Sequence, residues 1–243
     1  MVFNKDKDIN TEWNKYFYIW LTIKEYYNSF IGNKDLAEYI KYERDAMIPR
    51  STSSYILDYI KSYIKPGNSI LDIGCGEGGF LDNFINNDTK TFGLEYNQQR
   101  VKIAQMNGRN VVLGDMHDIP FDNRSFDIII GSEVLQQSRN PGRLINHWQS
   151  KLKKDGIIII SFFNSDYWKK QRWFNRNDWW KSIFYISQYV SNFNRAGFFS
   201  LLENNGLAIL EEIDYPDSSN QQFWIAICRK KNIMRSNNDN HSK

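Results

Sequence analysis

The sequence predicts an α/β protein with a Rossmann-like, mostly parallel sheet of seven strands and helices on both of its faces. Three observations predict this class. Short apolar runs rich in Ile and Val alternate with helix-like segments, as the buried strands of a parallel sheet do. A glycine-rich stretch follows the first run directly, and the last two runs are separated by only a few residues, the spacing of a hairpin. With 243 residues, 41% of them hydrophobic, the chain is long enough for one domain with additions.

Seven segments are expected to form strands, because each is short, apolar and rich in β-branched residues. They are Ser69–Ile73, Thr91–Glu95, Val111–Asp115, Phe126–Ser132, Gly156–Phe162, Leu207–Tyr215 and Phe223–Lys230. The first five alternate with helices and should run parallel, joined by right-handed crossovers. The last two are expected to form an antiparallel pair that closes one edge of the sheet.

Helices are expected between the strands and before the first of them. The segments between the strands are Gly79–Asn86, Gln98–Asn107 and Pro141–Lys154, and those before the first strand are Thr11–Phe30, Lys34–Ala46 and Ser51–Ile64. Pro141 fits the first turn of its helix. The domains that follow are an N-terminal helical cap or lid at 1–64, a main domain at 65–230 with an insertion at 165–190, and a disordered tail at 231–243.

The stretch ILDIGCGEGGF, residues 70–80, places an acid just before a glycine loop. Gly74, Gly76 and Gly79 satisfy G-x-G-x-x-G, the pattern of dinucleotide-binding loops. A pyrophosphate would rest on the free N–H groups of the following helix, but the carboxylate of Asp72 would repel it. A ligand with a positive centre would favour that carboxylate, and S-adenosylmethionine (SAM) carries both an ammonium and a sulfonium. The alternatives are a dinucleotide site and an Asp72 that only caps the turn.

Two more acids, Glu95 and Asp115, end the second and third expected strands. A carboxylate at Glu95 can accept both ribose hydroxyls. Asp115 can accept from the adenine amino group and the Met116 N–H can donate to a ring nitrogen, while Tyr96 or Met116 packs on an adenine face. Each acid alone can also be a solvated strand end, but three acids at successive strand ends favour a cationic nucleoside. The expected cofactor-binding residues are Asp72, Gly74, Cys75, Gly76, Gly78, Glu95, Tyr96, Asp115, Met116 and Ser132.

Over residues 70–164 the chain resembles the class I SAM-dependent methyltransferases. The matching motifs are ILDIGCGEGG, GLEYN, GDMHDIPFDNRSFDIIIGSEVLQQSRNP and LKKDGIIIISFFN. They look most like the ubiquinone-methyltransferase type and the W-type proteins of methionine biosynthesis, and enzymes that trim bacterial sugars and glycans share this body. The resemblance implies a seven-stranded sheet with the last strand antiparallel. Many relatives carry E-x-L-E-H where this chain has Glu133-Val134-Leu135-Gln136-Gln137, so no histidine base is carried over to Gln137.

The acceptor is expected beside the segments that follow the fourth and fifth strands. Glu133 is the candidate for an acceptor contact or a general base, and its alternative role is to orient the cofactor or the loop. The segment 165–182 mixes tryptophans with Lys and Arg, which suits an anionic, ring-bearing acceptor such as a phosphorylated or nucleotide-linked sugar. Alternatively, these tryptophans bury the segment against the N-terminal helices. The expected acceptor contacts are Gln136, Trp168, Arg172, Trp173 and Arg176.

Two histidines in this region are expected to have no catalytic role. His117 is interpreted as a surface or loop residue, and His147 as a structural residue of a helix that packs on the sheet.

These patterns predict an enzyme that methylates a small molecule, an anionic or glycan-precursor acceptor of polysaccharide biosynthesis. The alternatives are a SAM-binding partner or activator without turnover and, third, a dinucleotide oxidoreductase. A net charge of +3 is too small to indicate nucleic acid, so RNA is a minor alternative. No metal site is expected from the two cysteines, and no apolar run approaches a membrane span. The expected location is the cytoplasm, with membrane contact by the N-terminal helices as a minor alternative.

Overall fold

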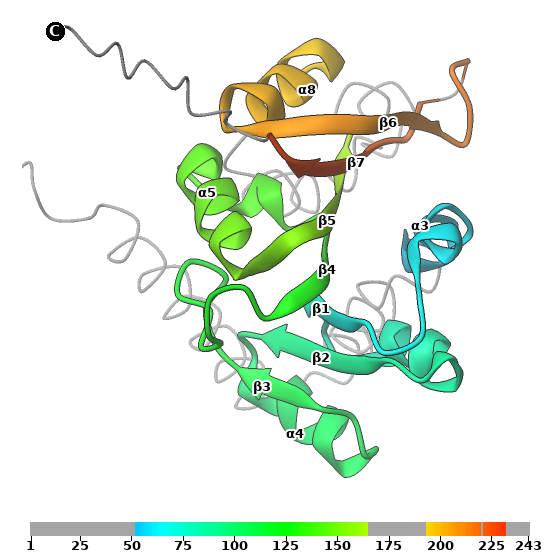
Figure 1. The fold of residues 1–243 in the computed structure, drawn as a ribbon, viewed down its shortest axis with the longest axis vertical. Helices are drawn as coiled ribbons and strands as arrows, with labels where there is room; N and C mark the ends of the chain where they lie inside the picture. The colour runs from blue at the N-terminus through cyan, green and yellow to red at the C-terminus, as the bar shows by residue number, and fades with distance from the viewer. Residues whose placement is uncertain (1–51, 165–192, 220, 232–243) are drawn as a thin grey trace, which may run out of the picture. The chain divides into compact units, whose positions relative to one another are not determined.

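The computed structural model describes residues 52–164, 193–219 and 221–231 of the chain (Figure 1). The chain divides into two compact units, Met1–Ser51 and Thr52–Lys243, and the described residues belong to the second. Two of the expected N-terminal helices, the whole insertion at 165–190 and most of the tail therefore lie outside the described residues. Among those that are described, no helix is long and apolar enough to cross a membrane.

A seven-stranded sheet forms the centre of this unit, in the order β3-β2-β1-β4-β5-β7-β6 (Figure 1). Its strands are β1 (Ser69–Ile73), β2 (Lys90–Glu95), β3 (Val111–Leu113), β4 (Phe126–Ser132), β5 (Leu152–Phe163), β6 (Leu207–Tyr215) and β7 (Phe223–Lys230). The first five strands pair in parallel, and β7 is antiparallel to both β5 and β6. The predicted fold class is confirmed, including the antiparallel last strand.

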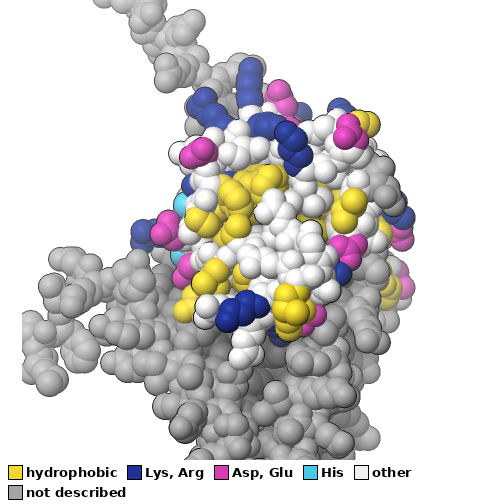
Figure 2. Space-filling model, turned by 90° about the horizontal axis from the view of Figure 1, so that it is seen from below, with side chains coloured by type: hydrophobic (Ala, Val, Ile, Leu, Met, Phe, Trp, Pro, Cys, Tyr) yellow, Lys and Arg dark blue, Asp and Glu magenta, His cyan; other side chains and the backbone are white. Residues whose placement is uncertain are grey.

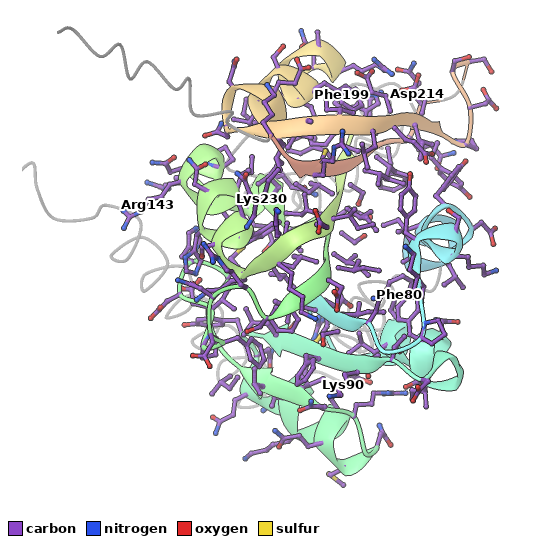
Figure 3. The ribbon with its side chains drawn as sticks, viewed as in Figure 1. Phe80, Lys90, Arg143, Phe199, Asp214 and Lys230 are labelled. Atoms are coloured by element: carbon purple, nitrogen blue, oxygen red, sulfur yellow. The ribbon has the colours of Figure 1, made fainter. Side chains whose placement is uncertain are left out.

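Helices cover both faces of the sheet. The described helices are α3 (Thr52–Ile60), η1 (Lys61–Tyr63), η2 (Gly79–Asn87), α4 (Gln98–Met106), η3 (Leu135–Gln137), α5 (Pro141–Lys151) and α8 (Arg195–Asn204), where η marks a 3₁₀ helix. One apolar cluster joins α5 and α8 to one face, with Trp148 and Phe198 fully buried in it. A second cluster joins α3, η2 and α4 to the other face, around Ile56 and Phe84. Figure 3 labels Phe199 of α8 and Phe80 of η2, which lie on opposite sides of the sheet.

The order of the strands places the switch point of the sheet at β1. The chain leaves β1 for β2 on one side, and it returns to β4 on the other side of β1. Crossovers in opposite directions mark the carboxyl ends of the two central strands as the edge where open α/β sheets bind their ligands. The glycine loop after β1 and the turn after β4 lie at this edge.

Several element boundaries differ from the expectation, and three of them change the sheet or the helix before its fifth strand. The helix predicted over Pro141–Lys154 ends at Lys151, and β5 begins at Leu152, not at Gly156. Leu152 pairs with Phe126, and a register shift follows before the regular ladder, so the polar residues between belong to the strand although their sequence suggests a helix end. The third strand ends at Leu113 because Asp115 leaves it to form a bridge with Asp118.

Helix α8 was not predicted. Asn194 caps it by accepting from Gly197 N–H at 2.8 Å. Arg195 in its first turn donates to Asp214 at 2.7 Å and Glu212 at 2.9 Å on β6, and its guanidinium lies 4.7 Å from the centre of the Phe199 ring. Phe199 and Asp214 are labelled at this corner in Figure 3. The helix is therefore fixed by contacts with the edge strand β6, which β5 and β7 separate from the central strands β1 and β4.

Candidate cofactor and acceptor site

The loop after β1 adopts a backbone that requires glycine at three positions. Gly74, Gly76 and Gly78 have φ of 73°, 59° and 74°, a left-handed region that side chains disfavour. A Cβ at Gly74 would also lie 2.8 Å from Cγ2 of Val134, whereas a Cβ at Gly79 would meet nothing within 4 Å. The geometry therefore uses the spacing 74, 76 and 78, and it does not depend on the third glycine of the dinucleotide pattern.

Asp72 lies in β1 just before this loop, and it pairs in the sheet with Gly93 of β2 and Ile130 of β4. The residue is only 5% exposed. Burial, and after it the nearby carboxylate of Glu95, raise the pKa of Asp72 to about 8, because both disfavour the charged form. A positive ligand would reverse this effect, so the position suits the binding of a cation.

Glu95, the last residue of β2, fixes the loop with both of its carboxylate oxygens. Oε2 accepts from Gly76 N–H at 2.9 Å, and Oε1 accepts from Asn97 N–H at 2.8 Å. Each oxygen keeps a second lone pair that a ligand hydroxyl can use. Glu95 thus anchors the glycine loop to β2, a role that its position in the sequence did not indicate.

Asp115 follows β3 and is held by the next residues of its own loop. Its Oδ1 accepts from the backbone N–H of His117 at 2.9 Å and lies 2.8 Å from ring Nδ1 of the same residue. Burial by itself raises the pKa of Asp115, but the hydrogen bonds and the charge of His117 outweigh it and lower that pKa below its ordinary value. The neighbouring Tyr96 is 45% exposed, and the side chain of Met116 packs against the core.

Cys75 and Ser132, the two remaining expected cofactor contacts, also lie at this edge. Cys75 is partly buried, and its Sγ would be 2.4 Å from a Cβ at Gly93, so the thiol lies over β2. Burial raises the pKa of this thiol. Ser132 ends β4, and its Oγ lies 3.2 Å from Oγ of Ser161 on β5.

The turn after β4 holds buried polar atoms that have no hydrogen-bond partner among the described residues. Glu133 has a φ of 55°, which is unusual for a residue other than glycine and costs roughly 1–3 kcal/mol. Its N–H is directed at Ser161, with the carbonyl oxygen at 3.2 Å and Oγ at 3.1 Å. Oε1 of Glu133 and both amide atoms of Gln136 are buried, and no residue that the structure describes gives them a hydrogen-bond partner. Burial raises the pKa of Glu133 to about 8.

Two arginines that the sequence analysis did not single out also contact the glycine loop. Arg109 donates to both carboxylate oxygens of Asp82, at 2.9 and 2.6 Å, and to the carbonyl of Glu77 at 2.8 Å. Nη1 of Arg100 lies 3.7 Å from the position of a Cβ at Gly76. Neither arginine belongs to a recognisable spacing, so no sequence signal was available to find them.

His117 is more enclosed than a surface residue. Its side chain is 25% exposed, and its ring lies between Asp115 and Ser138, with Nε2 3.1 Å from Oγ of Ser138. The expectation of a surface or loop residue is met by its position in the loop after β3, where the ring also joins two segments of the site. His147 has the expected structural contact in α5, where Nε2 accepts from Ile119 N–H at 3.1 Å.

The other expected acceptor contacts, Trp168, Arg172, Trp173 and Arg176, lie outside the described residues. Within the described part of the chain no group of three or more His, Cys, Asp or Glu side chains is placed to hold a metal ion.

A family described as "Methyltransferase domain" matches residues 43–212, well over half of the chain. The chain belongs to the methyltransferase domain family. The resemblance to class I SAM-dependent methyltransferases is thereby confirmed at the level of family and fold, and a dinucleotide oxidoreductase is not supported.

Three comparisons show how this methyltransferase domain relates to known proteins. It is 31% identical over 140 residues to a probable tRNA methyltransferase 9B of Bos taurus, covering 55% of this chain and 30% of that protein. It resembles the structure of 1,6-didemethyltoxoflavin-N1-methyltransferase of Burkholderia thailandensis, which contains 1,6-didemethyltoxoflavin and S-adenosylhomocysteine (TM-score 0.60, 14% identity, 85% and 90% of the two chains). It also resembles a complex of the Haloferax volcanii Trm112 methyltransferase activator with a methyltransferase (TM-score 0.57, 16% identity, 78% and 98%).

The methyltransferase domain spans about half the length or less of the first curated relatives that it matches. SAM is the cofactor of this class, and the residues present fit it. The buried carboxyl of Asp72 lacks the charge that an ammonium would restore, and the glycine backbone leaves the loop free of side chains at three positions.

Proposed function

We propose that this methyltransferase domain binds SAM across the carboxyl ends of β1, β2 and β3 and transfers its methyl group to a small-molecule acceptor. One observation carries the proposal: Asp72, Glu95 and Asp115 lie at three adjacent strand ends beside a loop that requires glycine. Such an edge favours a cationic nucleoside over a polyphosphate, because carboxylates repel phosphate and stabilise ammonium.

Each acid has a separate role in the proposed binding. Asp72 binds the ammonium of the methionine part, directly or through a water molecule. Glu95 accepts from the ribose hydroxyls, and Asp115 accepts from the adenine amino group. SAM, when bound, supplies a methyl group that its sulfonium has already activated, so the chain itself need only orient the reactants and exclude water.

The turn after β4 is the proposed acceptor side of the site. Val134 of this turn is directly against Gly74, so the turn adjoins the cofactor loop. The unpartnered atoms of Glu133 and Gln136 are costly unless a ligand satisfies them. With a pKa near 8, Glu133 is protonated at neutral pH and can take a proton from a hydroxyl acceptor only after it ionises. A hydroxyl-directed reaction should therefore accelerate as the pH rises toward 8.

A more specific part of the proposal is the chemical class of the acceptor. Aromatic and cationic residues in segment 165–182 support an anionic acceptor such as a nucleotide-linked sugar in polysaccharide biosynthesis, and cytoplasmic action is part of the same expectation. Replacing Trp173 or Arg176 by Ala should then raise the KM for the acceptor and leave SAM affinity unchanged. Lost SAM affinity in these variants would place the segment on the cofactor instead.

Two other roles have an observation in their favour. The likeness to a methyltransferase solved with its activator supports a protein partner, and thus the alternative of a SAM-binding partner without turnover. The relatives named as probable tRNA methyltransferases support RNA as acceptor. On the face visible in Figure 2, however, the described acidic and basic side chains are interspersed, which does not favour a polyanion.

Calorimetry with SAM and S-adenosylhomocysteine (SAH) tests the proposed site. Replacing Asp72 by Ala or Glu95 by Ala should each weaken binding roughly 10- to 100-fold, since a charge-assisted hydrogen bond is worth about 1.5–3 kcal/mol. Unchanged affinity in both folded variants would rule out the assigned site. SAH release with small anionic acceptors, compared with release on transfer RNA, then separates the acceptor classes. Binding without turnover, together with a co-purifying protein, would favour the partner role.

A further inference from the structure

The loop after β3 contains a chain of hydrogen bonds that no motif of the sequence indicated. One oxygen of Asp115, Oδ1, receives both the backbone N–H and the ring of His117, at 2.9 and 2.8 Å. The other oxygen, Oδ2, takes no part in these two contacts. The carboxylate is thereby oriented by His117 through two bonds that share one of its oxygens.

The partners of the His117 ring assign one tautomer to its neutral form. An ionised carboxylate can only accept, so Nδ1 of His117 carries the proton that points to Asp115. In the neutral ring Nε2 is then an acceptor, and it receives the hydroxyl of Ser138 at 3.1 Å. Oγ of Ser138, which is fully buried, accepts in turn from Asn140 N–H at 3.1 Å. Every donor in this series of hydrogen bonds has an acceptor. The lowered pKa of Asp115 agrees with an ionised Asp115 carboxylate.

Helix α5 holds the same loop from a second side. Trp148 Nε1 donates to the carbonyl of Met116 at 3.1 Å, and His147 Nε2 accepts from Ile119 N–H at 3.1 Å. Trp148 itself is fully buried beneath β4, where its ring would lie 2.5 Å from a Cβ at Gly131. The loop from Asp115 to Ile119 is thus fixed before any ligand arrives, which lowers the cost of ordering it on binding.

We propose that His117 is a positioning residue that sets the preference of this site for a 6-amino purine, by holding Asp115 so that Oδ2 faces the ligand. The proposal rests on the SAM site proposed above. A carboxylate fixed in this way accepts from the amino group of adenine, whereas the carbonyl oxygen of a 6-oxo purine would meet a second acceptor. The link to Ser138 also joins the adenine side of the site to the turn after β4.

The experiment compares the affinities of the full chain for SAH and for S-inosylhomocysteine, its 6-oxo counterpart, by calorimetry. The wild type should prefer SAH by roughly 10-fold or more, as expected for a charge-assisted hydrogen bond against a repelled oxygen. His117→Phe keeps the size of the ring and removes both of its hydrogen bonds, so it should reduce this preference at least about 5-fold. His117→Asn retains a donor near the place of Nδ1 and should restore most of the preference.

A matched control separates positioning from general loosening of the loop. His147→Phe removes the contact with Ile119 and leaves Asp115 and His117 intact, so it should lower the melting temperature and keep the wild-type preference. An unchanged preference in His117→Phe, or an equal loss in His147→Phe, overturns the proposal. A wild type that binds SAH without preference overturns it as well. A wild type that binds neither nucleoside overturns the proposed function itself, and the proposal with it.

Discussion

Burial of the Asp72 carboxyl opposes folding and favours binding at the same atom. The site keeps a carboxyl group 5% exposed, in an environment that raises its pKa to about 8. Because this burial is unfavourable, the ligand-free protein is less stable than it would be with an apolar or amide residue at position 72. A ligand ammonium would offset the unfavourable burial and so contribute to the free energy of binding. Such a trade between stability and function is common at ligand sites.

We expect Asp72→Asn to stabilise the ligand-free protein, and more so at high pH. The native pKa is about 8, whereas the unfolded chain has the ordinary value of about 3.9. The native state binds the proton more tightly, so the stability that this group contributes is complete below about pH 4 and is lost as the pH rises through 8. Asparagine does not titrate, and its advantage in melting temperature should grow by at least about 4 °C between pH 5 and pH 8.5.

Calorimetric melting of the two proteins at both pH values tests this expectation. Asp58→Asn is the matched control, because that carboxylate is exposed and pairs with Lys61 on the helix surface. It should show the same difference from wild type at pH 5 and pH 8.5. An Asp72→Asn advantage that does not change with pH would contradict the assigned environment of Asp72.

Gly93 supports the glycine loop from below, although it lies in a strand. A Cβ there would be 2.4 Å from Sγ of Cys75 and 2.8 Å from Cγ2 of Val111. Gly93→Ala should therefore displace the loop, costing about 1–3 kcal/mol of unfolding free energy and weakening SAH. Cys75→Ala removes the closest contact, so the double variant should regain part of both losses. Denaturant unfolding and calorimetry on the four proteins measure the coupling, and purely additive losses would show that Cys75 does not lie over Gly93.

At the scale of elements, the strands were predicted more reliably than their boundaries. The apolar runs of β1 and β4 are typical of a strand covered on both faces. Both strands begin and end as expected. The helix after Pro141 was extended through Lys153 and Lys154 because polar residues resemble a helix end. In the structure Lys153 instead pairs with Asp127 of β4 at 2.7 Å, a contact between distant residues that local pattern cannot reveal.

The same limit applies to the contacts that hold the glycine loop. The acids Asp72, Glu95 and Asp115 could be predicted because strand ends follow from local sequence. The hydrogen bonds of Arg109 could not be predicted, because they join a residue just before β3 to Asp82 in η2, which is distant in the sequence. Long-range partners of this kind require the packed structure.

We expect Arg109 to stabilise the glycine loop, where SAM is proposed to bind. Its guanidinium makes three hydrogen bonds, two to Asp82 and one to the carbonyl of Glu77, and its Cδ would be 3.1 Å from a Cβ at Gly78. Arg109→Met should weaken SAH about 3- to 10-fold and speed hydrogen exchange of the loop amides. Arg109→Lys should recover little, since a lysine cannot form the planar fork.

The control for Arg109 is Lys153→Met, which breaks an ion pair with Asp127 at the opposite end of the strands. Its SAH affinity and loop exchange should match the wild type. Equal SAH affinity in Arg109→Met and the wild type would show that the loop keeps its form without this residue.

At the scale of the whole molecule, two apolar clusters on opposite faces of the sheet hold the strand ends that form the site. The fold and the positions of the acids at or just after the strand ends were predictable because both follow from the alternation of strands and helices. Glu133 and Gln136 were expected on the acceptor side from their position after β4, but the positive φ of Glu133 was not expected, and the other expected acceptor contacts lie outside the described residues. Nothing in local sequence marks a strained glutamate or an unpartnered Gln136.

Binding of SAH should be coupled to proton release from the whole protein. Asp72 has a pKa of about 8 in the free state, so it is mostly protonated at pH 6 to 7, and an ammonium ligand favours its ionised form. Binding therefore releases a proton, and affinity should rise by tens-fold, as an order-of-magnitude estimate, between pH 6 and pH 8.

Calorimetry in two buffers of different ionisation enthalpy measures this proton directly, and two variants identify its source. SAH lacks the positive sulfur of SAM, so its only cationic group is the ammonium. Glu133 lies on the proposed acceptor side, so it is not expected to release a proton when SAH binds, although its pKa is also about 8. Glu133→Gln should therefore keep the pH dependence, while Asp72→Asn should bind more weakly and with an affinity that no longer changes with pH. Proton release that persists in Asp72→Asn and vanishes in Glu133→Gln would place the ammonium at the turn after β4 and reverse the assigned orientation of the ligand.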